Sequence, residues 1–235
     1  MSFRKNILLI NPWIYDFTAY DFWLKPVGLL YIASLLKKYA SFRLHFIDCL
    51  DRHHPILSKK VKSKPDGRGP FLKEEVPKPA VLKDIPRKYS RYGIPLPLFL
   101  HELSQIPRLD LVLLTCTMTY WYPGPFEVIH RVKTHWPGVP VALGGDYATL
   151  CADHARAYSG ADAVLTGPGE TQALHWVNRV IGQSRILTCP LGDILPAHDL
   201  RRPQGYVAIQ TARGCPFRCP YCAVHQLSSA GSREQ

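Results

Sequence analysis

The sequence lacks a long apolar run near its start. Two basic residues, Arg4 and Lys5, precede only four apolar residues, Ile7 to Ile10. A secretory signal peptide needs an apolar stretch of about 7–15 residues, and a membrane-spanning helix needs about 20. The start of the chain therefore predicts neither a signal peptide nor a membrane span.

The sequence also lacks the pattern of a disulfide-stabilised domain. It has seven cysteines in 235 residues, and three of them are clustered near the C-terminal end. Disulfide scaffolds are typical of small secreted proteins, so this usage fits a reducing compartment better, and we expect the protein to be cytoplasmic. The other four cysteines lie in apolar or loop contexts that predict small packed side chains (Cys49, Cys116, Cys151 and Cys189).

Acidic residues are scarce in one segment. The formal net charge is +11, and residues 52–92 contain twelve Lys and Arg residues but only four acids. Eight of the eleven net charges therefore lie in one Pro-rich stretch, which we interpret as a solvated basic insertion over residues 52–107. A site for a polyanion or a partner is the alternative interpretation. Because the charge is so localised, we expect no nucleic-acid partner.

Short apolar runs alternate with helical patterns through residues 1–183. The predicted strands cover residues 6–10, 43–48, 109–115, 139–143 and 161–166, and the predicted helices cover residues 26–39, 98–103, 125–135, 147–158 and 170–181. A long loop rich in aromatic residues follows the first strand. This alternation predicts an α/β fold with a Rossmann-like (flavodoxin-like) doubly wound parallel sheet.

Four polar or glycine-rich stretches follow the predicted strands, at residues 11–12, 115–124, 144–147 and 166–170. Ligands of such sheets bind beyond the carboxyl ends of the strands, and hydroxyls, glycines and a helix N-terminus suit phosphate or amide groups. The Gly167-Pro168-Gly169 stretch lacks the third glycine of a dinucleotide fingerprint. Paired glycines after a strand also occur in ordinary tight turns.

Three cysteines at spacings of four and three residues form the most specific motif. Residues 184–205 are predicted to be a linker, and residues 206–210 a short buried strand that leads into Cys215, Cys219 and Cys222. Three thiolates can hold three irons of an iron–sulfur cube and leave the fourth iron open. Two other interpretations are a zinc site completed by His225, since structural zinc takes four ligands, and unligated thiols.

This motif resembles the signature of the radical S-adenosylmethionine enzymes. The resemblance implies that Cys215, Cys219 and Cys222 hold a [4Fe–4S] cluster and that Tyr221 lies near the adenine of S-adenosylmethionine. It implies reductive cleavage of S-adenosylmethionine to a 5′-deoxyadenosyl radical, with a reductant such as flavodoxin or ferredoxin. Residues 206–235 would then begin a partial barrel.

The order of the two parts resembles the cobalamin-binding members of that family. The resemblance implies that small residues after the third, fourth and fifth strands contact cobalamin: Thr117, Thr119, Gly144, Gly145, Gly167 and Gly169. The loop 11–27 contains no histidine that could serve as lower axial ligand, and Asp51-Arg52-His53 follows the wrong strand. The fifth-strand motif of the family, Gly-Glu-Gly-Glu, reads Gly-Pro-Gly-Glu here.

The resemblance implies an enzyme that catalyses methyl transfer or a radical rearrangement, and the substrate cannot be identified from the sequence. The sequence ends thirteen residues after Cys222, so we expect an N-terminal fragment that is inactive by itself. The alternatives are a non-catalytic corrinoid or iron–sulfur binding module and a zinc-stabilised regulatory domain.

Overall fold

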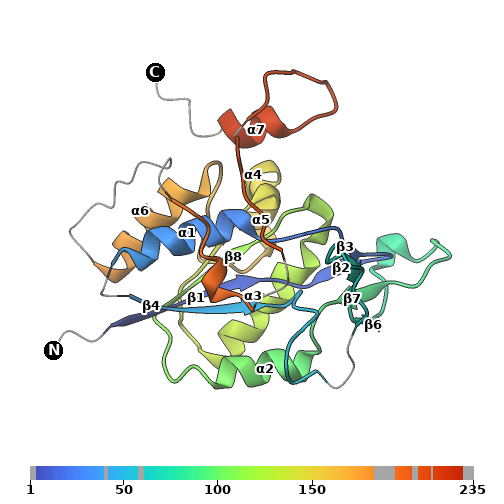
Figure 1. Ribbon diagram of the computed structural model, residues 1–235, viewed down its shortest axis with the longest axis horizontal. Helices are drawn as coiled ribbons and strands as arrows, with labels where there is room; N and C mark the ends of the chain where they lie inside the picture. Colours follow the sequence, from blue (N-terminus) through green and yellow to red (C-terminus); the bar gives the residue numbers. More distant parts are fainter. Residues whose placement is uncertain are drawn as a thin grey trace.

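A five-stranded parallel sheet forms the centre of the protein in a computed structural model that describes residues 4–39, 42–57, 61–182, 194–202, 206–212 and 214–229 (Figure 1). The strands are β1 (Lys5–Asn11), β4 (Phe42–Asp48), β8 (Leu111–Thr115), β9 (Val141–Gly144) and β10 (Ala163–Val164). Their order in the sheet is β10-β9-β8-β1-β4. Counted along the chain this is 2-1-3-4-5, the flavodoxin-like order. The predicted α/β fold is confirmed.

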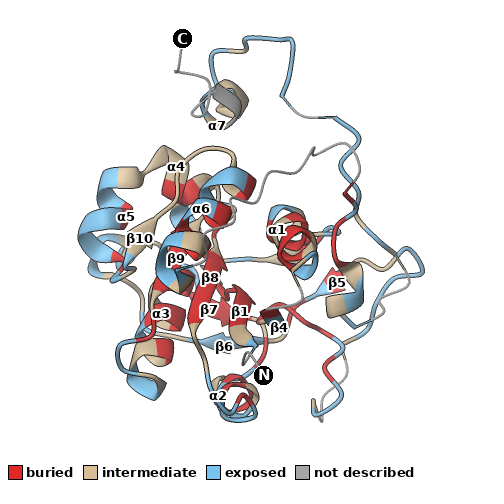
Figure 2. Cartoon of the chain, turned by 90° about the vertical axis from the view of Figure 1, so that its left-hand side faces the viewer, coloured by how far each residue is buried: buried red, intermediate tan, exposed pale blue. Residues whose placement is uncertain are grey.

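Helices cover both faces of the sheet. Helices α1 (Val27–Lys37) and α6 (Gly169–Ile181) pack on one face, and α2 (Leu96–Ser104), α3 (Pro123–His135), α4 (Asp146–Leu150) and α5 (Ala152–Tyr158) lie on the other. In β1, Ile7 and Leu9 pack in the core on the face covered by α1 and α6, and Leu8 and Ile10 pack in the core on the opposite face. This explains the continuous apolar run, because both faces of the strand are buried (Figure 2).

The aromatic loop and the basic insertion fold together. Strand β2 (Ile14–Asp16) pairs with β7 (Ser90–Tyr92), which also pairs with β6 (Lys73–Glu75), and β3 (Tyr20–Asp21) pairs with β5 (Gly69–Pro70). The insertion also contains a 3-10 turn, η1 (Ala80–Leu82). The predicted short helix within it is confirmed as α2. The insertion is therefore built onto the loop after β1, and two of its cations, Arg52 and Arg91, are buried.

Two local predictions are wrong. The helix expected at 147–158 is two helices, because Cys151 leaves helical geometry with φ −123° and ψ 43°. The buried strand expected at residues 206–210 does not form: Val207 and Ile209 are 64% and 65% exposed, and the described residues beyond 205 contain no strand. Without a neighbouring strand, the segment makes no ladder of backbone bonds, although the Ala208 carbonyl lies 2.9 Å from Nε2 of His198.

The described part of the expected linker packs on the sheet domain. Residues 183–193 and 203–205 lie outside the described residues. Ile194 and Ala197 are buried beside α1, and the Ala197 amide donates to the Leu30 carbonyl at 3.0 Å. A 3-10 turn, η4 (His198–Leu200), follows, and α7 (Val224–Ser229) ends the described chain. Within the described ranges no helix has the length and apolar character needed to cross a membrane.

Candidate functional site

A cavity of about 170 Å³ lies at the carboxyl edge of the sheet. The ends of β8 and β9, the loop after β10, and helices α1, α4 and α6 surround it. This is the edge at which doubly wound sheets bind their ligands. A closed apolar cavity of about 150 Å³ accommodates a single aromatic ring. The cavity therefore has room for one flat ring system, or for one such group of a larger ligand.

Four of the six glycines and threonines expected at a cofactor site line this cavity: Gly144, Gly145, Gly167 and Gly169. Gly145 has φ 92°, and a Cβ there would lie 2.6 Å from the Cys116 carbonyl oxygen. The backbone conformation at position 145 requires glycine, so a larger residue there would distort the loop and would not test the cavity alone. A Cβ on Gly28, in α1, would meet no atom within 4 Å. Gly28 is therefore the better position for blocking the cavity.

The two expected threonines lie on the neighbouring loop. Thr117 lines a separate pocket of about 10 Å³ together with Trp13 and Cys116, and Thr119 begins a 3-10 turn, η2 (Thr119–Trp121). Cys116 is buried, burial raises its pKa to about 12, and its thiol donates to the Met118 carbonyl. This loop is thus packed beside the glycine-lined cavity without lining it.

Thr149 fastens two of the cavity's glycine loops together. Its hydroxyl donates to the Gly145 carbonyl at 3.0 Å and accepts from the Gly167 amide at 3.0 Å. The first contact follows the ordinary backward bond of a helical threonine to the residue four positions earlier. The second contact joins residues 18 positions apart through tertiary structure, so it could not be predicted from a local pattern.

Two carboxyl groups border the cavity at the starts of helices. Asp146 begins α4 and Glu170 lies in the first turn of α6, and both line the cavity. Glu170 is buried, and burial raises the pKa of the Asp146 carboxyl. Carboxylates repel phosphate and accept from N–H and O–H donors. The cavity therefore suits a neutral or donor-bearing group better than a phosphate.

The three-cysteine loop is exposed. Cys215 and Cys222 are exposed, Cys219 is half-buried, and the Cys222 amide donates to the Cys219 carbonyl at 3.0 Å. Among the described side chains, no three His, Cys, Asp or Glu residues are gathered closely enough to hold a metal ion. The donor set nevertheless has the chemistry of an iron–sulfur site, because three thiols lie within eight residues of each other.

The other two predicted residues of the loop are Tyr221 and His225. Tyr221 is 88% exposed. The His225 ring lies 2.5 Å from the Phe217 carbonyl oxygen, so it is used within the loop and does not complete a zinc site in this arrangement. Helix α7 follows the loop directly, and its Leu227 lines the glycine-bordered cavity. Figure 1 shows α7 beside α4, with the cysteine loop extending beyond it away from the sheet.

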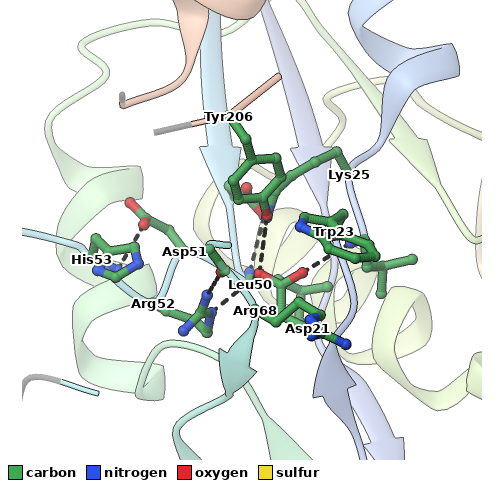
Figure 3. Close-up of polar contacts among 12 residues, drawn as sticks. Asp21, Trp23, Lys25, Leu50, Asp51, Arg52, His53, Arg68 and Tyr206 are labelled. Carbon is green, nitrogen blue, oxygen red and sulfur yellow. Dashed lines mark hydrogen bonds and ion pairs between the residues drawn. The ribbon is translucent and has the colours of Figure 1, made fainter. Parts of the chain in front are cut away.

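A buried ion cluster joins the loop after β1, the insertion and the C-terminal segment (Figure 3). The Asp21 carboxylate accepts from Lys25 at 3.0 Å and from Arg52 at 3.1 Å. All three side chains are at most 3% exposed. The Tyr206 hydroxyl donates to the same carboxylate at 3.4 Å, and burial raises the Tyr206 pKa. Sequence reasoning missed this cluster because its members resembled surface charges.

Two further ion pairs hold the segment before Tyr206. Arg201 donates to Asp48 at 3.1 Å and Arg202 to Asp51 at 2.8 Å. Asp48 also accepts from the side-chain amide of Asn11 at 2.7 Å. The segment that leads to the cysteine loop is thereby attached at the carboxyl ends of β1 and β4.

The chain is similar to curated proteins over part of its length. It is 30% identical over 140 residues to the tRNA-2-methylthio-N(6)-dimethylallyladenosine synthases of Vibrio vulnificus and Vibrio parahaemolyticus, which covers 53% of this chain and 28% of each synthase. It is 31% identical over 111 residues to an uncharacterized methyltransferase of Synechocystis sp., which covers 42% of this chain and 19% of that protein. The chain thus spans less than a third of the length of these relatives. No protein-family profile and no solved structure matches it. The chain is therefore distantly related to group-transferring enzymes.

Proposed function

We propose that this chain is the cofactor-binding part of a radical S-adenosylmethionine enzyme. The observation that carries the proposal is the three-cysteine loop, whose thiols are local in sequence, accessible and not paired with one another. The similarity to tRNA-2-methylthio-N(6)-dimethylallyladenosine synthases, which belong to that family, supports it. Cys215, Cys219 and Cys222 would hold a [4Fe–4S] cluster, which supplies the electron that cleaves S-adenosylmethionine.

The residues around the thiols suit this role. The loop packs against few neighbours, so the thiols can converge on a cluster without disturbing a core. Tyr221, at 88% exposure, is available to stack on the adenine of S-adenosylmethionine. Cys219 is half-buried, and the hydrogen bond from the Cys222 amide to its carbonyl oxygen forms one turn of the loop.

The cavity is the proposed site for one end of a corrinoid. Gly144, Gly145, Gly167 and Gly169 leave the backbone open there, and the volume of about 170 Å³ suits the flat base of a nucleotide tail rather than a whole corrin ring. Among the described residues that line the cavity there is no histidine, so we propose that cobalamin would bind there without a protein imidazole as lower ligand. Thr117 and Thr119 could contact only the part of the ligand outside the cavity.

The proposed reaction is methyl transfer to an unactivated carbon or phosphorus, or a radical rearrangement. The chain's own contribution is to bind and orient the cofactors while a reductant such as flavodoxin or ferredoxin supplies electrons. The second candidate is a binding module for a corrinoid or a cluster without turnover. The third is a zinc-stabilised domain, which His225 disfavours through its contact with the Phe217 carbonyl.

Anaerobic reconstitution with iron and sulfide tests the cluster. We expect a broad visible absorption shoulder and, after reduction, the electron paramagnetic resonance spectrum of one cubane. Ala at any one of the three cysteines should abolish both, whereas His225→Ala and the buried Cys49→Ala should retain them. Stoichiometric zinc that is lost in His225→Ala would instead establish the zinc site.

Titration with hydroxocobalamin tests the cavity. Gly28→Leu should weaken binding by at least tenfold because its side chain enters open space in the cavity. Gln172→Leu, at an exposed position of α6, is the matched control and should bind as the parent chain does. Absence of corrinoid binding to a folded parent chain would rule out the corrinoid and leave the cluster proposal intact.

A further inference from the structure

Two large aromatic side chains are exposed beside a basic turn. Phe22 is 62% exposed and Trp23 is 44% exposed, on the loop that follows β3. The Arg68 guanidinium lies over both rings, with its Cζ 5.9 Å from the Phe22 centroid and 5.0 Å from the Trp23 centroid. We call Phe22, Trp23 and Arg68 the aromatic platform. The platform exposes flat π surfaces to solvent from the loop after β3 and from a turn of the insertion. Figure 3 shows Trp23 and Arg68 together.

The backbone under the platform is strained. Trp23 has φ 64°, and among the described residues it is the only non-glycine residue with positive φ. Such a conformation costs on the order of 1–3 kcal/mol and persists where surrounding contacts fix it. Here the Trp23 indole N–H donates to the Asp66 carbonyl at 2.8 Å, and the next amide, of Leu24, donates to the Asp21 carboxylate at 2.8 Å. Strain held in place at an exposed aromatic residue indicates a functional surface.

Cations dominate the surroundings of the platform. Lys62 and Lys64 are exposed on the same turn, where the Lys64 amide donates to the Arg68 carbonyl at 2.8 Å. Beneath the turn, Arg52 donates to the Gly67 carbonyl at 2.5 Å. On the turn at residues 61–69, three cations (Lys62, Lys64 and Arg68) stand against one carboxylate, Asp66, which pairs with Arg68 at 2.6 Å. The local field is positive.

We propose that this surface binds single-stranded nucleic acid. Unpaired bases would stack on Phe22, Trp23 and the Arg68 plane, and phosphates would lie toward Lys62 and Lys64. Aromatic rings interleaved with cations are the usual means of binding single strands, because every base has a π face and every phosphate a charge. In a duplex the base faces are stacked on one another, so a duplex would bind this surface through its phosphate charges alone.

This inference replaces the expectation of no nucleic-acid partner, which rested on the charge distribution alone. Charge in a solvated insertion indicates no partner by itself, whereas two exposed aromatic rings under a guanidinium, one of them on a strained backbone, favour one. The inference does not depend on a cluster or a corrinoid. The platform also adjoins the C-terminal segment, since a Cβ on Gly67 would lie 2.5 Å from the ring of Tyr206. A bound strand would lie beside the start of the segment that carries the cysteines.

Fluorescence anisotropy with the full chain tests the proposal. The probes are a labelled 12-nucleotide unstructured RNA and a 12-base-pair RNA duplex, each titrated at several salt concentrations. We expect the single strand to bind at least tenfold more tightly than the duplex. Phe22→Ala and Trp23→Ala should each weaken single-strand binding by roughly 5- to 150-fold, the range measured for loss of one stacked base. The Lys62→Glu/Lys64→Glu variant should weaken it further and reduce its salt dependence.

Matched controls lie at the opposite end of the sheet, on α5. Tyr158→Ala removes an aromatic residue that is 68% exposed, and Arg156→Ala removes a cation that is 56% exposed. Both should bind as the parent chain does. If Trp23→Ala fails to fold, as judged by circular dichroism, Phe22→Ala and the double lysine variant decide the question, because their side chains are exposed. Equal affinity for the duplex, or affinity that falls with salt but is unaffected by Phe22→Ala, would overturn the proposal.

Discussion

The sheet domain and the cysteine segment are stabilised in different ways. In the sheet domain, β1 is paired on both sides with parallel strands, and Ile7 to Ile10 are fully buried. In the described part of 206–229, the backbone–backbone bonds outside α7 are local, and Phe217 and Tyr221 are 71% and 88% exposed. Among the described residues, the most specific sequence motif therefore lies in a largely exposed segment rather than in a packed core. We expect that the proposed cluster, rather than packing, would order the cysteine loop.

The ion cluster is the most deeply buried of the polar contacts described above, and removing its carboxylate should have the largest effect on stability. Asp21→Ala leaves Lys25 and Arg52 buried without a counter-charge and removes the acceptor of Tyr206. We expect a loss of about 3–5 kcal/mol in the free energy of unfolding, measured in urea. Asp199→Ala, which breaks an exposed pair with Lys37, should cost less than about 1 kcal/mol. Equal costs for the two variants would contradict the role of the cluster.

Truncation of one apolar side chain in each region tests the difference in packing. Leu113→Ala, in β8, removes a side chain that is 2% exposed and should cost about 2–5 kcal/mol in the free energy of unfolding. Ile209→Ala, at 65% exposure, should change it by no more than about 0.5 kcal/mol. Urea denaturation of both variants measures this. A large loss in Ile209→Ala would show that the segment packs against the domain in solution.

Limited proteolysis separates the attached and unattached parts of the C-terminal segment. Trypsin should cut after Arg218, in the exposed loop, on the order of tenfold faster than after Arg201, whose side chain is 5% exposed and bonded to Asp48. Asp48→Ala should accelerate the cut after Arg201 and leave the cut after Arg218 unchanged. Mass spectrometry of the early fragments identifies the sites. Cleavage at Arg201 first would show that the ion pairs do not hold the segment.

The smallest expected effect is a dependence of stability on pH. Burial, and secondarily Arg43, lowers the pKa of His45 on β4. The unfolded chain therefore binds more protons than the folded one below about pH 6.5, so the stability present at neutral pH falls as the pH drops through that value toward the lower folded pKa. Urea midpoints at pH 7.5 and 5.5 measure this. His45→Gln should reduce the difference, and an unchanged difference would assign it to other groups.

The sequence predicted what depends on local pattern. Strands β1, β8 and β9 were recognisable because their apolar runs are buried on both faces, and the glycines at 144–145 and 167–169 because tight turns after strands need them. The β2–β7 pairing was not predictable, since each strand has three residues and the paired residues nearest in sequence, Asp16 and Ser90, are 74 residues apart. Arg52 was counted with the solvated charges because a sequence does not show that Asp21 lies beside it.

The same pairing of β2 with β7 has a consequence for the order in which the chain can fold during synthesis. Ile14 pairs with Tyr92, which is translated 78 residues later. At about 5–20 residues per second, the aromatic loop after β1 waits roughly 4–16 s for its partner strand. During that interval its rings and its unpaired strand edge are open to chaperones and to other nascent chains. Slowed translation of the insertion should therefore reduce the yield of folded protein more than slowed translation of the residues after β10.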